Sequence, residues 1–211
     1  MLIFDLDGTL LNTSYDLHAS LNYALKKHNL PEKTLEETLT MLGNGIDILV
    51  AGAIENGKNN PNFEEIYSTF RNYYKEHIND YTIPYEGIIE LLQTLKQKNI
   101  KMGIVSNKFD EGVKDLQKKY FKNLIDYAQG VSDTIKKKPC PDAVFELIKN
   151  SNAINETNIY IGDSEVDIKT AQNANIPCIS VSWGFRSKEY LQSINAKIII
   201  DTPNELLNYI S

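Results

Sequence analysis

Cysteine and long apolar runs are scarce in this sequence of 211 residues. The two cysteines, Cys140 and Cys178, form neither a metal-binding nor a redox motif, which favours a reduced, cytoplasmic setting. No apolar run approaches the length of a membrane span. The first expected strand begins with the chain itself, which leaves no room for a signal peptide. We therefore expect a cytoplasmic protein that does not insert into a membrane.

Positive charge is also in deficit, with 22 Lys and Arg against 28 Asp and Glu and a net charge of -6. This balance argues against non-specific binding to nucleic acid or to an anionic membrane. The hydrophobic fraction of 42% and the charged fraction of 24% are those of an ordinary globular protein. The chain is long enough for one domain and a smaller module, and its oligomeric state stays open.

The most informative stretch is residues 2–10, LIFDLDGTL. Its apolar run predicts a buried strand that Gly8 ends, so Asp5 and Asp7 lie at the carboxyl end of the strand. Ligands bind at that end of open α/β sheets, and residues two apart share a face of a strand. Two carboxylates in one place repel, and they are tolerated when a cation joins them or when chemistry needs them. The alternative is a strand followed by a simple Asp-Gly turn.

Beyond the first strand, the pattern changes twice. Residues 14–82 show helical spacing and no convincing strand, whereas strands and helices alternate from residue 83 onward. Strands are expected at 102–106, 158–162, 178–181 and 197–200, and a last helix at 203–210. This alternation predicts an α/β fold with a Rossmann-like, doubly wound parallel sheet. We expect a core of residues 1–13 and 83–211, with an all-helical domain of residues 14–82 inserted after the first strand.

Three further groups of polar residues stand at or near expected strand ends. Ser106 and Asn107 follow the second strand, which on its own is typical of a turn or cap. Lys138 ends a lysine triplet before Pro-Cys-Pro, where a solvated loop is the alternative. Asp163 ends another strand, and Asp167 lies four residues further, so the two can face one site; helix capping by Asp163 is the alternative.

Together these four motifs resemble the signatures of the haloacid dehalogenase superfamily, and the Asp-x-Asp-Gly-Thr form resembles its phosphatase branch. The resemblance implies that Asp5 is the nucleophile that takes up a phosphoryl group. It implies that Asp7 protonates the leaving oxygen and later activates water. A carboxylate is a competent nucleophile, and a second carboxyl can move the proton.

The same resemblance assigns the other residues. The residues implied in phosphate binding are Thr9, Ser106, Asn107 and Lys138. Lys138 is also implied as a catalytic residue beside Asp5 and Asp7, and Lys137 is the alternative lysine. The implied cofactor is Mg²⁺, held by the carboxylates of Asp5 and Asp163 and the backbone carbonyl of Asp7. Asp167 is expected to orient water or Lys138, and Glu165 to face solvent.

The runs around these motifs look most like phosphoglycolate phosphatases, so the expected function is Mg²⁺-dependent hydrolysis of a small soluble phosphomonoester such as 2-phosphoglycolate. The helical domain is then a cap over the site, and Gly43-Asn44-Gly45 is either a substrate-contacting loop or a helix break without function. The alternatives are a β-phosphoglucomutase-type transferase, a pyrophosphatase or a nucleotidase of the same superfamily. A catalytically silent binding module is the alternative from a different class.

Overall fold

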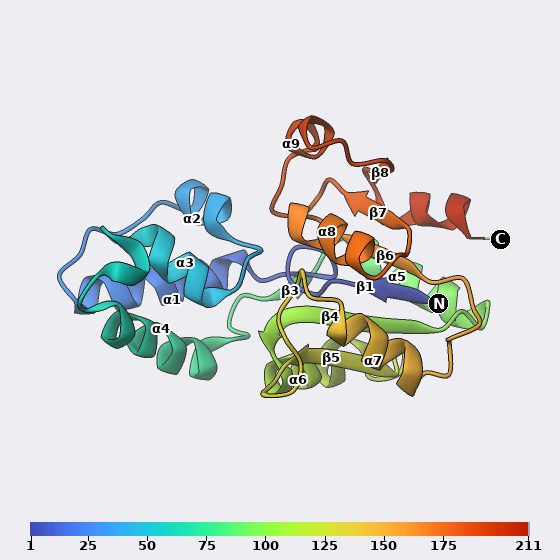
Figure 1. Ribbon diagram of the computed structural model, residues 1–211, viewed down its shortest axis with the longest axis horizontal. Coiled ribbons are helices and arrows are strands. Elements are labelled where there is room, and N and C mark those ends of the chain that lie inside the picture. Colours follow the sequence, from blue (N-terminus) through green and yellow to red (C-terminus); the bar gives the residue numbers. More distant parts are fainter. Residues whose placement is uncertain (211) are drawn as a thin grey trace. The chain divides into compact units, whose positions relative to one another are not determined.

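The computed structural model describes residues 1–210, which form two compact units along the chain (Figure 1). One unit contains Met1–Leu11 and the chain from Pro84 onward, and the other contains Asn12–Ile83. Within the described residues, every helix is too short or too polar to cross a membrane.

The first unit is built on a six-stranded sheet with the order β5-β4-β1-β6-β7-β8, in which every pair of neighbours is parallel. The strands are β1 (Leu2–Phe4), β4 (Met102–Phe109), β5 (Tyr127–Val131), β6 (Ile159–Gly162), β7 (Cys178–Val181) and β8 (Ile199–Ile200). The strand order reverses beside β1, so the crevice for a ligand is expected at the carboxyl ends of β1 and its neighbours.

Helices cover both faces of this sheet. Successive residues of β1 point to opposite sides, and each side has its own buried apolar cluster. Leu2 and Phe4 belong to one buried cluster, and Met1 and Ile3 belong to the other. The first cluster is covered by α5 (Ile88–Gln97), α6 (Asp110–Phe121) and the 3-10 helix η2 (Pro203–Tyr209). The second is covered by α7 (Asp142–Asn150) and α8 (Glu165–Asn173). The predicted Rossmann-like, doubly wound sheet is confirmed.

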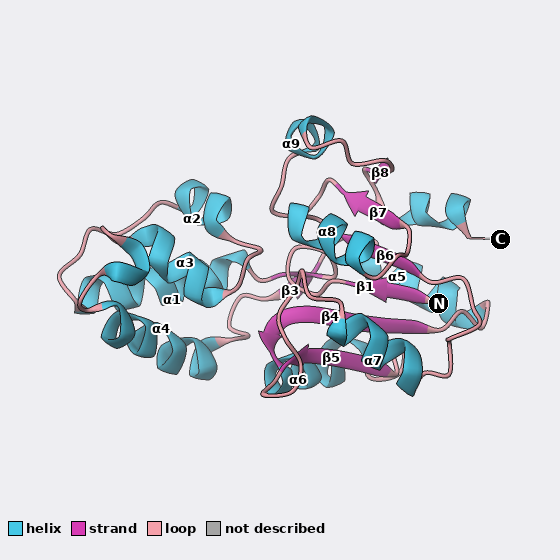
Figure 2. Cartoon of the chain, in the orientation of Figure 1, coloured by secondary structure: helices cyan, strands magenta, loops and turns pink. Residues whose placement is uncertain are grey.

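The second unit is helical, as the cyan ribbons of Figure 2 show. It contains α1 (Ser14–Lys27), α2 (Leu35–Met41), α3 (Ile46–Ala53), the 3-10 turn η1 (Gly57–Asn59) and α4 (Phe63–His77). Buried apolar residues at helical spacing join α1 to α4. The chain enters through β2 (Leu11–Asn12) and leaves through β3 (Ile83–Pro84), and these two short strands pair with each other.

A buried carboxylate joins the beginning and the end of the helical unit. Asp16, which is 2% exposed, accepts hydrogen bonds from the backbone N–H of Tyr81 at 2.9 Å and of Thr82 at 3.0 Å. It also accepts one from the Thr82 hydroxyl at 2.6 Å. The unit is therefore closed by polar contacts near the two points where the chain enters and leaves it.

Several elements differ from the sequence prediction. The strand expected at 102–106 continues to Phe109 with a shift of register after Val105, so Asn107 and Lys108 lie within β4 and not beyond it. The helix expected at 203–210 is the 3-10 helix η2. A short helix, α9 (Lys188–Ser193), was not expected, because its six residues are too few for a periodic pattern.

Candidate active site

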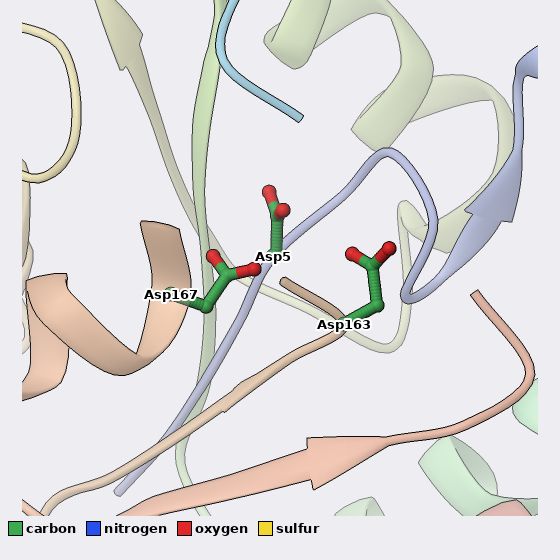
Figure 3. Close-up of side chains that lie close together, drawn as sticks. All are labelled: Asp5, Asp163 and Asp167. Atoms are coloured by element: carbon green, nitrogen blue, oxygen red, sulfur yellow. The ribbon is translucent and has the colours of Figure 1, made fainter. Parts of the chain in front are cut away.

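Three buried carboxylates meet at the carboxyl end of the sheet. Asp5 directly follows β1, Asp163 directly follows β6, and Asp167 lies in the first turn of α8. One oxygen of each lies within 4.8 Å of one oxygen of each of the others. Figure 3 shows these three side chains gathered beside the strand ends. The structure thus brings together three acids that are up to 162 positions apart in the sequence (167 − 5 = 162).

Asp5 is held by two donors on the same oxygen. The N–H of Leu6 donates to Oδ1 at 2.7 Å, and the Lys138 ammonium lies 2.8 Å from that oxygen. Both donors therefore lie on the Oδ1 side of the carboxylate. Burial raises the pKa of Asp5 well above its ordinary value, and the nearby Asp167 carboxylate raises it further.

Asp163 is held at both of its oxygens. The N–H of Phe185 donates to Oδ2 at 2.7 Å, and the Thr9 hydroxyl donates to Oδ1 at 3.3 Å. Two glycines pack against this carboxylate, since a Cβ added to Gly8 or Gly184 would lie within 2.5 Å of its atoms. Burial raises the pKa of Asp163 to about 7, and Asp167 adds to this shift.

Asp167 is saturated by contacts within the protein. Its Oδ2 accepts hydrogen bonds from the N–H and the hydroxyl of Ser164, at 3.1 and 2.6 Å, which completes a capping box at the start of α8. Its Oδ1 lies 2.7 Å from the Lys138 ammonium. Asp167 therefore contacts Lys138, which is one of the two partners expected for it, and Ser164 rather than Asp163 is the N-cap of α8.

Lys138 is a buried cation, 4% exposed, between two anions. Burial alone would lower its pKa, but Asp167 and Asp5 outweigh burial and hold the pKa well above its ordinary value. Its backbone is held by Asn107, whose side-chain oxygen accepts from the Lys138 N–H at 2.6 Å and whose amide donates to the Lys138 carbonyl at 3.4 Å. Asn107, expected at the phosphate, thus contacts the lysine loop.

Asp7 lies beside a second buried lysine. Lys108, which is 8% exposed, places its ammonium 3.1 Å from Asp7 Oδ1, and the Ser106 hydroxyl donates to Oδ2 at 3.3 Å. The N–H of Lys108 in turn donates to the Ser106 hydroxyl at 3.2 Å. The shift of register in β4 places these residues beside Asp7, because an irregular strand can re-aim its side chains.

The donor set suits a hard divalent cation. Asp5 and Asp163 each offer carboxylate oxygens, and their pKa values are raised, first by burial and then by repulsion from the Asp167 carboxylate. A bound cation would relieve this repulsion. Oxygen ligands of this kind are those that Mg²⁺ takes. Asp167 is less suited to be a direct ligand than Asp163, because its Oδ2 accepts two hydrogen bonds from Ser164 and its Oδ1 already faces the Lys138 ammonium.

One predicted group lies elsewhere in the chain. Gly43, Asn44 and Gly45 form the connection between α2 and α3 in the helical unit. Gly43 and Gly45 have φ values of +100° and +95°, so this turn needs glycine for its own backbone.

Lys108 and the residues after β7 are the site components that the sequence did not indicate. Trp183, Gly184 and Phe185 contact Thr9 or Asp163. The sequence did contain a signal for the segment after β7. Trp183 follows the strand predicted at 178–181, and ligands bind at the carboxyl ends of strands in such sheets. Glu165, expected to face solvent, pairs instead with Arg186 at 2.9 Å.

Comparison with known proteins agrees with this geometry. A family model described as haloacid dehalogenase-like hydrolase matches residues 2–181. The chain is 27% identical to phosphoglycolate phosphatase from Pseudomonas syringae pv. tomato, over 98% of this chain and 78% of that protein. It is also 27% identical to pyrophosphatase PpaX from Bacillus mycoides, over 99% of this chain and 95% of that protein.

A solved structure gives the same result for the fold. The crystal structure of a protein from Lactobacillus delbrueckii subsp. bulgaricus, inferred to be a phosphoglycolate phosphatase, has a TM-score of 0.94 to this chain. The two are 34% identical, and the match covers 99% of this chain and 97% of that one.

Proposed function

Since the chain belongs to the haloacid dehalogenase-like hydrolase family and is a phosphatase, we propose that it hydrolyses a small soluble phosphomonoester such as 2-phosphoglycolate. The proposed reaction requires Mg²⁺ and passes through an aspartyl-phosphate. The observation that supports this most strongly is the pairing of buried Asp5 with Lys138, beside a second acid, Asp7, two residues further. In the proposed reaction Asp5 attacks and Asp7 moves a proton.

In the first step, a carboxylate oxygen of Asp5 attacks the phosphorus atom, and the bond from phosphorus to the ester oxygen breaks. Asp7 gives its proton to that oxygen, so the organic group leaves as a neutral alcohol. Ser106 and Lys108 contact the two oxygens of the Asp7 carboxyl, and in the proposed step they hold it for this transfer. The phosphoryl group is then bonded to Asp5.

In the second step, Asp7, now a carboxylate, takes a proton from water as the water oxygen attacks phosphorus. The bond from phosphorus to Asp5 breaks, which releases inorganic phosphate and restores both carboxyl groups to their starting states. The same residue thus acts first as acid and then as base.

The groups proposed to bind the phosphate and the metal all belong to the first unit. Thr9, Ser106 and Lys138 are the proposed phosphate-binding residues, and Asn107 positions Lys138 through its backbone. The metal would be held by the carboxylates of Asp5 and Asp163 and by the Asp7 carbonyl. When bound, it supplies positive charge against the phosphate and the carboxylates.

The helical unit, Asn12–Ile83, is proposed as a cap that excludes water from the site and contacts the organic part of the substrate. The turn Gly43-Asn44-Gly45 is the proposed contact loop. Its backbone N–H groups can approach an anion closely, because two of its three residues lack a Cβ.

Pyrophosphate hydrolysis is a second candidate. It is favoured by the similarity to pyrophosphatase PpaX, which extends over 99% of this chain at the same identity as the similarity to phosphoglycolate phosphatase. Both reactions transfer a phosphoryl group to Asp5 and differ only in the leaving group.

A substrate panel tests the proposal. Purified protein is assayed with 2-phosphoglycolate, pyrophosphate, a nucleoside monophosphate and glucose 1-phosphate, each with Mg²⁺ and with chelator. We expect release of phosphate only with Mg²⁺, and the highest kcat/KM for 2-phosphoglycolate. A higher kcat/KM for pyrophosphate would select the second candidate. Full turnover in chelator, or no turnover of any phosphate ester, would contradict the proposal.

A further inference from the structure

The segment of residues 183–186, which follows β7, is built around Asp163. The indole N–H of Trp183 donates to the carbonyl of Thr9 at 3.0 Å, and the next residue, Gly184, lies against the Asp163 side chain. A Cβ added to Gly184 would lie 2.3 Å from both the Asp163 Cβ and the Gly8 carbonyl oxygen. No other amino acid fits at this position without movement of the backbone.

The close approach of Gly184 brings the next residue, Phe185, within hydrogen-bonding distance of the Asp163 carboxylate and so fixes the rotation of that carboxylate. The N–H of Phe185 reaches Asp163 Oδ2 at 2.7 Å, opposite the Thr9 hydroxyl on Oδ1. Because a hydrogen bond to an ionised oxygen is short and strong, this contact favours one orientation of the carboxylate. The orientation of Asp163 therefore depends on where the 183–186 segment lies.

An ion pair ties that segment to α8. Arg186 Nε lies 2.9 Å from Glu165 Oε2, and its terminal nitrogen lies 3.0 Å from Oε1. Arg186 is 9% exposed and the Glu165 side chain is 33% exposed, so this two-point contact is partly shielded from water. Glu165 is the first residue of α8, the helix that also carries Asp167 and through it orients Lys138.

We propose that Glu165 and Arg186 are positioning residues for the metal site, whose ion pair holds the 183–186 segment so that Phe185 orients Asp163 for the divalent cation. In this proposal the pair acts through Phe185 and Asp163 and is not itself a metal ligand. This inference rests on the proposed function, since it takes Asp163 as a metal ligand. It predicts that metal affinity depends on a contact outside the ligand set, as partners that orient ligands commonly show.

The test measures Mg²⁺ binding directly, without substrate. Metal-free wild type, Arg186→Gln and Glu165→Gln are titrated with Mg²⁺ by calorimetry, and the Mg²⁺ concentration for half-maximal phosphatase activity is measured in parallel. The matched control is Lys188→Gln, which removes the neighbouring exposed ion pair with Asp201. In both test variants we expect the Mg²⁺ Kd to rise by about tenfold or more, with most turnover restored at saturating Mg²⁺. The control should bind Mg²⁺ as the wild type does.

The possible outcomes separate three explanations. If the variants melt at a lower temperature but bind Mg²⁺ with the wild-type Kd, the pair only stabilises the fold and the inference is wrong. If wild type itself binds no Mg²⁺, both the inference and the proposed cofactor are wrong. Should Arg186→Gln fail to fold, Arg186→Lys keeps the charge but loses the two-point contact, and the same rise in Kd is expected.

Discussion

Asp5 and Lys138 form the contact on which the proposed chemistry depends. The lysine ammonium lies between Asp5 and Asp167, so it offsets the charge of the attacking group without being consumed. Burial raises the pKa of Asp5 when no cation other than Lys138 is near. Lys138 and a bound divalent cation would both favour the ionised form of Asp5, which is the form that attacks.

Replacement of Asp5 by Asn should abolish turnover and leave the fold intact. The amide is nearly isosteric but is a far poorer nucleophile, so we expect a loss of about a thousandfold or more in kcat. Steady-state assays and circular dichroism check the two halves of this statement. The exposed Asp133→Asn is the matched control and should keep wild-type activity. Retention of more than about a tenth of the activity by Asp5→Asn would refute the role of Asp5.

Asp163 makes the stability of the metal-free protein depend on pH. Its pKa is about 7 in the folded chain and about 4 in an unfolded one. Between these values the folded protein holds a proton that the unfolded chain has released, so rising pH favours unfolding. The thermal midpoint without metal should therefore fall as the pH rises from about 4 to about 7, and should level off above that range.

Two comparisons isolate this effect. In Asp163→Asn, which cannot ionise, the fall should be smaller over the same range. In wild type with saturating Mg²⁺ it should also be smaller, because the cation replaces the proton as the partner of the carboxylate. Differential scanning fluorimetry across this range measures all three curves. A wild-type curve parallel to that of Asp163→Asn would show that Asp163 does not titrate there.

At the scale of elements, β4 and the lysine loop act together. Asn107 lies on β4 and holds the Lys138 backbone at two points. Asn107→Leu should preserve much of the side-chain volume but remove both hydrogen bonds. We expect kcat to fall by about tenfold to a hundredfold as the lysine loses its position. Asn173→Leu, which removes a hydrogen bond to the Pro139 carbonyl on the exposed side of the same loop, is the control and should change kcat little. Equal kcat for wild type and Asn107→Leu would contradict this coupling.

The helical unit has its own polar closure. Asp16→Ala should leave the backbone N–H and hydroxyl of buried Thr82 without their carboxylate acceptor. A buried donor left unsatisfied costs about 1–3 kcal/mol. We expect a lower thermal midpoint and faster proteolysis near residues 78–84. Asp80→Ala, which removes an exposed pair with His77, is the control and should have little effect. An unchanged midpoint in Asp16→Ala would show that this closure contributes no stability.

At the scale of the molecule, the parallel sheet and most helices follow from the sequence because their apolar periodicity is strong. Asp5 and Asp163 are indicated at the carboxyl ends of strands for the same reason, since each follows an unbroken apolar run. Lys108 directly follows Asn107 in the sequence, but its contact with Asp7 could not be predicted, because the irregular end of β4 determines the direction of its side chain.

The 183–186 segment could not be predicted from residue types. Phe185 contributes its backbone N–H, a group that all residues except proline carry, and Gly184 contributes the absence of a side chain. Glu165 likewise pairs with Arg186, 21 positions away, through a contact that only the folded sheet creates. The residues that carry the chemistry have a sequence signature, whereas those that position them depend on tertiary structure.

The most direct test of the central claim is to identify the residue that carries the phosphoryl group. Asp7→Asn is mixed with p-nitrophenyl phosphate and Mg²⁺, quenched in acid and analysed by peptide mass spectrometry. Because p-nitrophenolate barely needs a proton to leave, the first step should proceed, while the second should slow by about a hundred- to ten-thousandfold. We predict a burst of p-nitrophenolate approaching one equivalent per site and a phosphoryl group on Asp5. Absence of a burst, or a phosphoryl group on any other residue, would contradict the account.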